Sequence, residues 1–247
     1  MSSEMGTAKQ SIRKHVWDLL ERERVVEPGV HGYIPAFTGA DTAADRLAEL
    51  PAWRAAGVIK AVPDRAQLPV REHALRDGKL VYMAVPRLAD DLPFYLLDPA
   101  SLSVPPAEVA SSEGAARAAR KIGVAHMRPV DLVVCGSVAV NRAGTRLGKG
   151  ASYSDIEVAL LQEAGLISPH TVIVTTVHPL QVLSDPIPET EHDFSVDVIV
   201  TPDEVIQCGP PRRPGRLDWE QLTAEKIAAI PVLAERAAAS GREAGTP

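Results

Sequence analysis

The chain has 247 residues, of which 45% are hydrophobic, and a formal net charge of −6. This size suits one large α/β domain, and the acidic balance excludes a general basic surface for nucleic acid. Two cysteines are too few for a disulfide framework, no secretory leader is recognisable, and no apolar run approaches the roughly 20 residues that cross a bilayer. We therefore expect a cytoplasmic protein with no membrane partner and no nucleic-acid partner.

The chain opens with a helical pattern. Apolar residues at helical spacing predict a helix from Thr7 to Arg24 with one buried face. Lys9 and Arg13 are four residues apart, so they lie one above the other on the same side of this helix. From the residues alone, this pair indicates two solvated cations.

A loop rich in glycine and proline follows at residues 27–39. Its aromatic residues Tyr33 and Phe37 could line a pocket or cover the core. The next expected elements are helices at 40–50 and 52–56, a strand at 58–62, a helical stretch at 64–75 and a strand at 79–86.

Two charged residues directly follow strands in this half. Asp64 opens the stretch at 64–75, where an ordinary N-cap aspartate would explain it. Arg87 follows the strand at 79–86; it could bind an anion in a pocket or lie solvated in a loop.

The next segment is less regular. A strand is expected at 94–97. An alanine-rich pattern predicts one helix over 107–122, with Arg117, Arg120 and Lys121 near its carboxyl end, where cations complement the helix dipole.

The central stretch combines a strand, a glycine-rich loop and a helix. An apolar run at 130–134 predicts a buried strand, and the pattern after residue 155 predicts an amphipathic helix ending at Gly165. Between them, Gly144, Gly148 and Gly150 would let backbone N–H groups face an anion. Arg146 and Lys149 would neutralise its charge. The alternative to an anion-binding loop is a surface hairpin with two solvated cations.

Acidic residues complete this pattern. Asp155 is a candidate Mg²⁺ ligand, because this hard cation takes carboxylate and phosphate oxygens. Asp197 stands in an otherwise apolar strand, where an unpaired carboxylate is costly unless a metal or a basic partner compensates it. We therefore expect Asp155 and Asp197 to form the metal pair, with Asp193 a weaker third candidate.

The last part contains a strand at 171–177, a proline-rich basic linker at 209–216 and a helix at 219–239 that Pro231 should kink or split. Residues 241–247 are expected to be frayed. We assign 1–208 to one α/β domain and expect 209–247 to pack on it. Strands that alternate with helices predict a three-layer α/β sandwich with a mainly parallel sheet, which binds ligands at the carboxyl ends of its strands.

Residues 144–155 read Gly-Thr-Arg-Leu-Gly-Lys-Gly-Ala-Ser-Tyr-Ser-Asp. This segment resembles the nucleotide-binding signature of the 5-formyltetrahydrofolate cyclo-ligase family, roughly G-x-R-L-G-x-G-x-G-Y-Y-D. Ser152 replaces a glycine and Ser154 replaces a tyrosine of that signature. The sequence of this stretch is still more similar to a divergent branch, the methenyltetrahydrofolate synthetase domain-containing proteins.

The resemblance implies a fold similar to the NagB/RpiA/CoA-transferase group. It also implies ATP- and Mg²⁺-dependent conversion of 5-formyltetrahydrofolate to 5,10-methenyltetrahydrofolate. It assigns catalysis to Arg146, Lys149 and Tyr153, and Mg²⁺ binding to Asp155 and Asp197. The implied ATP-binding residues are Lys9, Arg13, Gly144, Arg146, Leu147, Gly148, Lys149, Gly150, Ser152 and Tyr153. For the substrate, the resemblance implies that Asp64 contacts the pterin and that Tyr153 faces the substrate. The predicted substrate-binding set is completed by three candidates from the residues alone, Tyr33, Phe37 and Arg87.

The departures at Ser152 and Ser154 leave two other functions open. One is a related ATP-dependent ligase that forms a C–N bond on another amine or carboxyl substrate. The other is a non-catalytic binding protein on the same scaffold. The sequence is also compatible with a homodimer.

Overall fold

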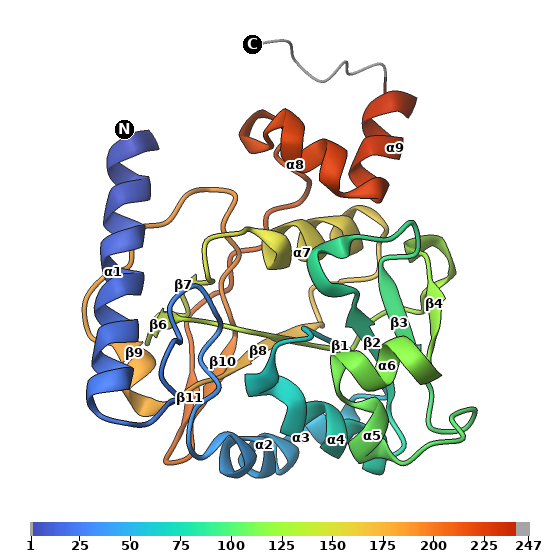
Figure 1. Ribbon diagram of the computed structural model, residues 1–247, viewed down its shortest axis with the longest axis horizontal. Coiled ribbons are helices and arrows are strands. Elements are labelled where there is room, and N and C mark those ends of the chain that lie inside the picture. Colours follow the sequence, from blue (N-terminus) through green and yellow to red (C-terminus); the bar gives the residue numbers. More distant parts are fainter. Residues whose placement is uncertain (1, 241–247) are drawn as a thin grey trace.

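An eight-stranded sheet organises residues 2–240, the part of the chain that the computed structural model describes (Figure 1). In spatial order its strands are β11 (Val205–Gln207), β10 (Val198–Val200), β8 (Val172–Thr176), β5 (Leu132–Cys135), β1 (Val58–Ala61), β2 (Leu80–Ala84), β3 (Phe94–Leu97) and β4 (Arg120–Ile122). The five strands from β10 to β2 are parallel, and β11, β3 and β4 are antiparallel additions at the two edges. The predicted, mainly parallel sheet is confirmed.

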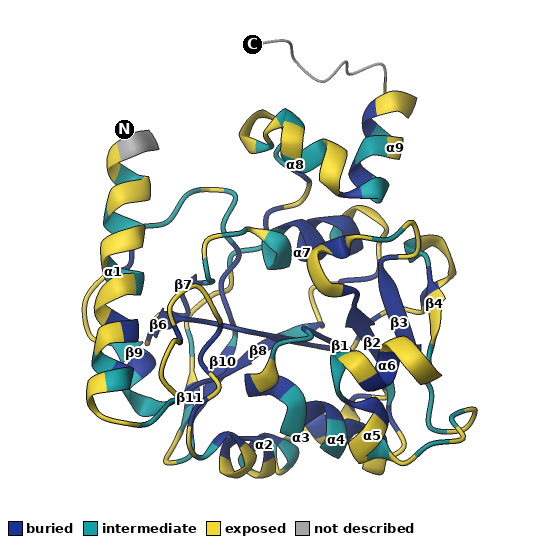
Figure 2. Cartoon of the chain, in the orientation of Figure 1, coloured by how far each residue is buried: buried dark blue, intermediate teal, exposed yellow. Residues whose placement is uncertain are grey.

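The central strands form because their sequences are short, β-branched and apolar. β5 reads Leu-Val-Val-Cys and is buried along its whole length, and β8 is buried except at its first residue. Such uninterrupted apolar runs suit parallel strands that helices cover on both faces. Figure 2 shows these strands as the buried interior of the molecule.

Helices cover the two faces of this sheet in separate layers (Figure 1). One layer contains α2 (Ala40–Ala48), α3 (Pro51–Ala55), α4 (Leu68–Arg76), α5 (Pro106–Val109) and α6 (Ser112–Ala118). α7 (Tyr153–Glu163) covers the opposite face, and α9 (Pro231–Ala239) packs over it. Each face has its own apolar cluster, so the predicted three-layer sandwich is confirmed.

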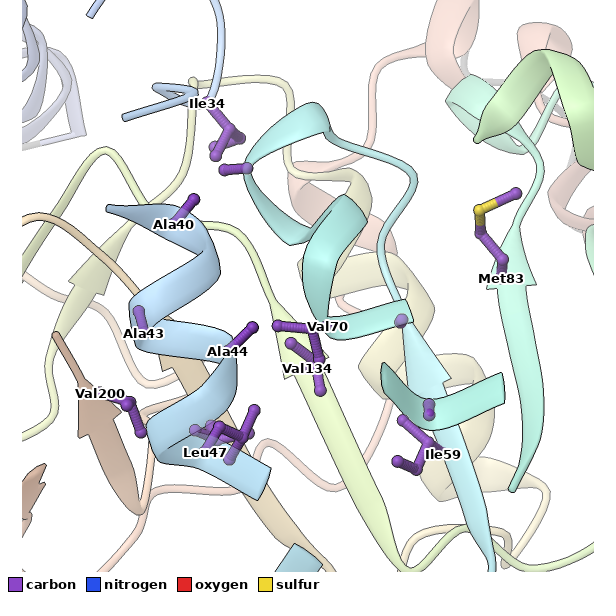
Figure 3. Packing of buried hydrophobic residues seen from close by; sticks show 14 of the residues in the cluster. Ile34, Ala40, Ala43, Ala44, Leu47, Ile59, Val70, Met83, Val134 and Val200 are labelled. Carbon is purple, nitrogen blue, oxygen red and sulfur yellow. The ribbon is translucent and has the colours of Figure 1, made fainter. Parts of the chain in front are cut away.

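Small side chains let α2 approach the sheet closely. Ala43, Ala44 and Leu47 of this helix point toward the strands that carry Val134 and Val200 (Figure 3). All five side chains are at most 1% exposed. Dense packing of this kind fixes the strand ends that carry the functional side chains.

Two strands of a second, three-stranded sheet form inside the predicted glycine-rich loop. This sheet consists of β6 (Ala139–Asn141), β7 (Arg146–Leu147) and β9 (Val182–Leu183). The stretch after β5 is therefore a β6–β7 hairpin followed by a short loop at 148–152. α1 (Ser2–Arg22) packs against β6, which brings the opening helix next to this loop.

The predicted helix at 107–122 is wrong. Two short helices, α5 and α6, occupy its first part, and the edge strand β4 occupies its end. The break has a local cause: Ser111 caps α6 by accepting the N–H of Gly114, and a Cβ at Gly114 would lie 1.7 Å from the carbonyl oxygen of Glu108. Lys121 pairs with Asp90 at the sheet edge, so it does not complement a helix end.

The C-terminal segment returns to the main body. Leu217, Ile230 and Leu233 are buried with the residues of α7. Pro231 separates α8 (Ala224–Ala229) from α9, as the sequence predicts. The expectation for 241–247 falls outside the described residues. None of the described helices has the length and apolar character that a membrane span requires.

Candidate functional site

A cleft of about 670 Å³ opens at the carboxyl ends of β1, β2 and β5. The residues after these strands supply its walls, and the loop before α7 supplies its rim. The lining residues are His31–Ile34, Val62–Asp64, Pro86, Arg87, Gly136, Arg146 and Gly148–Asp155, with Glu157. This is the position at which open α/β sheets bind ligands.

Arg146 is a buried cation in this cleft. Its side chain is 3% exposed, pairs with the carboxylate of Asp155, and stacks 3.9 Å from the ring centroid of Phe194. Its Nε atom is buried and has no hydrogen-bond partner within the protein. Arg146 is therefore not a solvated cation of a surface hairpin. Its unpaired Nε is a hydrogen-bond donor that a bound group could use.

Asp155 occupies the first turn of α7, beside this cation. Burial raises the pKa of Asp155, the charge of Arg146 opposes that shift, and the negative charge of Asp193 adds to it. The carboxylates of Asp155 and Asp193 thus act on one another near the start of α7. A cation between them would remove their repulsion.

The loop residue Lys149 reaches the opposite wall. Its Nζ lies 3.0 Å from Oδ1 of Asp64, and both residues line the cleft. Asp64 makes no side-chain cap to the short helical turn that follows it, so the ordinary N-cap explanation does not apply. Lys149, predicted to bind ATP, and Asp64, predicted to bind the substrate, are therefore neighbours in this structure.

Of the two cations of α1, Arg13 contacts the glycine-rich loop and Lys9 contacts Asp193. Lys9 Nζ lies 2.6 Å from Asp193 Oδ2, and Arg13 Nε donates to the carbonyl of Gly148 at 2.7 Å. A Cβ at Gly150 would lie 3.6 Å from the Arg13 guanidinium. Arg13 and Gly148, 135 positions apart in the chain, are thus brought together, although neither Lys9 nor Arg13 is among the residues that line the cleft.

The predicted pairing of Asp155 with Asp197 is not formed. Asp197 precedes β10 beside the amino-terminal end of β8, where its Oδ2 accepts the N–H of Ile173 and pairs with Arg213. The basic partner Arg213, rather than a metal, offsets the cost of placing this carboxylate beside an apolar strand. The acid next to Asp155 is instead Asp193.

Asp193 is held as a carboxylate by its surroundings. Burial alone would raise its pKa, but hydrogen bonds from Lys9 and from the N–H of Thr190 outweigh burial and lower it. Asp193 also shares a smaller cavity with Asp155, on the outer side of the loop. The two acids therefore flank the start of α7.

The predicted substrate-binding residues separate into two groups. Tyr33 and Arg87 line the cleft; Tyr33 is 65% exposed, and Arg87 has a φ of +61° directly after β2. Phe37 is buried in the core, with its ring centroid 6.2 Å from that of His178. The assignment of Phe37 to the substrate is thus corrected: this side chain covers the core.

Two of the predicted ATP-binding residues are part of the scaffold. Gly144 has a φ of +92° in the hairpin turn, and a Cβ there would lie 2.4 Å from the carbonyl oxygen of Val196. Leu147 is buried in the core. Neither lines the cleft, whereas Gly148, Lys149, Gly150, Ser152 and Tyr153 do.

The base of the cleft contains a buried ion pair that was not predicted from the sequence patterns. Lys60 of β1 is fully buried and pairs with Glu157 of α7, which also lines the cleft. The signal was present: each is a lone charged residue in an apolar run, at 58–62 and at 156–161.

Ser152 adopts the conformation that glycine would favour. Its φ of +53° and ψ of +14° are left-handed, and its side chain makes no cap to α7. Since this conformation costs a non-glycine residue about 1–2 kcal/mol, we expect Ser152→Gly to raise the free energy of unfolding by about 1 kcal/mol. Urea denaturation measures this change. Ser154→Gly, inside α7, should lower the same quantity by about 0.5 kcal/mol; equal losses in both variants would contradict the expectation.

The fold and the cleft define the class: an α/β protein with a cleft lined by charged residues at the carboxyl ends of its parallel strands, where open sheets of this kind bind ligands. The chain belongs to the 5-formyltetrahydrofolate cyclo-ligase family, whose model matches residues 5–202. The family indicated by residues 144–155 is confirmed, and the curated relatives that match the chain carry the name of the divergent branch.

Relatives of that branch match most of the chain. It is 36% identical over 246 residues to the methenyltetrahydrofolate synthase domain-containing protein of Bos taurus, covering 94% of this chain and 63% of that protein. The Mus musculus protein of the same name is 37% identical over 246 residues, covering 94% and 64%. The chain thus spans a little under two thirds of the length of these curated relatives.

A solved structure supports the fold. The Aquifex aeolicus 5,10-methenyltetrahydrofolate synthetase is 20% identical and aligns with a TM-score of 0.52 over 86% of this chain and 97% of its own.

Proposed function

We propose that this protein is an ATP- and Mg²⁺-dependent ligase that converts 5-formyltetrahydrofolate to 5,10-methenyltetrahydrofolate and releases ADP and phosphate. The observation that carries the proposal is the cleft that Arg146 and Lys149 line together with the glycine-rich loop before α7, while Arg13 holds the Gly148 carbonyl of that loop. Cations, glycine backbone and a helix start together form a phosphate-binding arrangement. Within this proposal the protein acts in the cytoplasm on a small molecule.

The proposed reaction requires positioning and charge neutralisation more than a covalent nucleophile. The formyl oxygen of the substrate is a poor leaving group, and transfer of the γ-phosphoryl group of ATP to it creates a good one. A neighbouring amine nitrogen of the substrate then attacks the activated carbon and closes the ring. Arg146 and Lys149 would hold phosphate oxygens, and Tyr33, Asp64, Arg87 and Tyr153 would contact the substrate.

The carboxylates at the start of α7 fit a Mg²⁺ ion. No group of three or more His, Cys, Asp or Glu side chains among residues 2–240 is arranged to hold a metal. Mg²⁺ in phosphate-handling sites takes one or two carboxylates plus phosphate oxygens and water, so two acids suffice. Asp155 would hold it together with Asp193, and the ion would neutralise phosphate charge when bound.

Mg²⁺ dependence tests this assignment. We expect Asp155→Asn and Asp193→Asn each to raise the Mg²⁺ concentration for half-maximal activity by roughly 10-fold or more, because each removes a carboxylate from the ion. Asp197→Asn should leave that concentration unchanged, since its carboxylate binds Ile173 N–H and Arg213. A titration of activity against Mg²⁺ separates the three variants; a shift with Asp197→Asn alone would contradict the assignment.

The direct experiment is an assay of the purified protein with Mg-ATP and 5-formyltetrahydrofolate. The expected result is growth of the methenyl chromophore, with one ADP released for each product formed. Binding of ATP without chromophore would overturn the folate reaction. Absence of nucleotide affinity would overturn the enzymatic function and leave a binding protein.

A second candidate is a related ligase that forms a C–N bond on a non-folate amine or carboxyl substrate. The observation that favours it is the Lys149–Asp64 pair, because Lys149 neutralises the acid expected to recognise the pterin. ATP hydrolysis that depends on another amine or carboxylate, with no chromophore from 5-formyltetrahydrofolate, would select this alternative.

A further inference from the structure

A lysine from the C-terminal segment reaches the loop before α7. Lys226, on α8, donates to the carbonyl of Ala151, and its Nζ lies 4.4 Å from the ring centroid of Tyr153. It lies beyond residue 202, where the match to the family model ends. Neither the glycine-rich motif nor the cleft lining includes it.

The segment around Lys226 is anchored on the helix that Tyr153 begins. Glu163, at the end of α7, accepts the N–H of Leu217 at 2.9 Å and pairs with Arg236 of α9. Ile230 and Leu233 are fully buried in the apolar cluster that contains α7. Residues 217–239 are thus fixed at both ends of their path, and Lys226 is presented at a defined place.

The contacts of Lys226 constrain the loop in two ways. Because the peptide bond is planar and trans, the Ala151 carbonyl that faces Lys226 turns the Ser152 N–H away from α8. The ammonium group above the Tyr153 ring restrains that ring through a cation–π contact. Burial lowers the pKa of Lys226, and the negative charge of Asp155 opposes this shift by stabilising the ammonium group.

We propose that Lys226 is a positioning residue of the active site: it fixes the Ala151–Ser152 peptide and the Tyr153 ring in the orientation that receives nucleotide phosphates. The nucleotide part of this inference rests on the proposed function. The positioning part concerns the loop itself and is measurable without a ligand. The C-terminal segment beyond the family match is then part of the functional unit.

The test compares Lys226→Met, which keeps most of the side-chain length without the charge, with Lys226→Arg, which keeps the donor and the cation. Hydrogen exchange of the backbone amides at 148–153 is measured in the free full-length chain, and KM and kcat are measured with Mg-ATP. Lys121→Met is the matched control: the Lys121 ammonium group likewise combines a polar contact, here to Asp90, with a tyrosine ring centroid at 6.0 Å, but it lies on the edge strand β4.

In Lys226→Met we expect exchange at 148–153 to quicken and KM for Mg-ATP to rise by about 10-fold, with a smaller change in kcat, because a charged hydrogen bond and a cation–π contact are both lost. Lys226→Arg should restore both values, and Lys121→Met should change neither. Unchanged exchange at 148–153 in Lys226→Met would overturn the inference. Quicker exchange in a protein that binds no ATP at all would support positioning and overturn the proposed function.

Discussion

Arg146→Met is expected to lower kcat/KM for Mg-ATP by about 100- to 1,000-fold. The reason is that loss of one preorganised charged donor in an active site costs about 2.7–4 kcal/mol of transition-state stabilisation. Arg146 is such a donor, because Asp155 and the ring of Phe194 hold its guanidinium and its Nε has no partner in the protein. Steady-state kinetics with varied Mg-ATP measure the effect.

The same substitution also affects stability, and a second change separates the two effects. Arg146→Met leaves the Asp155 carboxylate, 28% exposed, without its cation, so we expect the free energy of unfolding to fall by about 2–4 kcal/mol. Adding Asp155→Asn should recover most of this stability by removing the uncompensated charge, but not the activity. Arg142→Met, on the exposed hairpin turn, is the control and should change neither quantity. Recovery of activity in the double variant would show that Arg146 acts only through stability.

Local patterns predicted the elements that form this site. The strand at 130–134 was clear because three valines and a leucine leave little alternative to a buried strand. The glycine-rich loop was recognisable because Gly144 and Gly150 supply the positive φ angles that its path requires. Lys9 and Arg13 were placed at the loop by resemblance, since their helical spacing alone indicated only a common side.

Partners distant in the chain could not be predicted from local patterns. Asp197 and Asp193 are four residues apart, yet only Asp193 reaches the start of α7, because Asp197 begins an edge-side strand and is satisfied by Arg213. Phe37 and Tyr33 belong to one loop and face the core and the cleft respectively. Such choices depend on how strands and loops are placed in space, which periodicity does not describe.

The buried pair Lys60–Glu157 should have the largest effect on stability among the described residues. Both side chains are at most 4% exposed, so removal of one partner leaves an uncompensated charge in the core. We expect Lys60→Met to lower the free energy of unfolding by about 3–5 kcal/mol at pH 7. Urea denaturation with a check of a constant m-value measures it.

The dependence on pH identifies the cause. Burial raises the pKa of Glu157 even beside Lys60, and without Lys60 it must rise further. A carboxyl group whose pKa is raised in the folded state binds its proton more tightly there than in the unfolded chain. The loss of unfolding free energy in Lys60→Met should therefore shrink as the pH falls toward the ordinary carboxyl pKa of about 4.3. The same variant should therefore lie closest to wild type in acid.

A double variant distinguishes the lost charge from lost packing. Lys60→Met with Glu157→Gln should recover most of the stability, because two neutral side chains of similar size remain in contact. The exposed pair Lys14–Asp18 provides the matched control: Lys14→Met should change the free energy of unfolding by less than about 1 kcal/mol at any pH. A loss in Lys60→Met that is independent of pH and persists in the double variant would assign the effect to packing. Glu157 would then line the cleft without any electrostatic coupling to the strand beneath it.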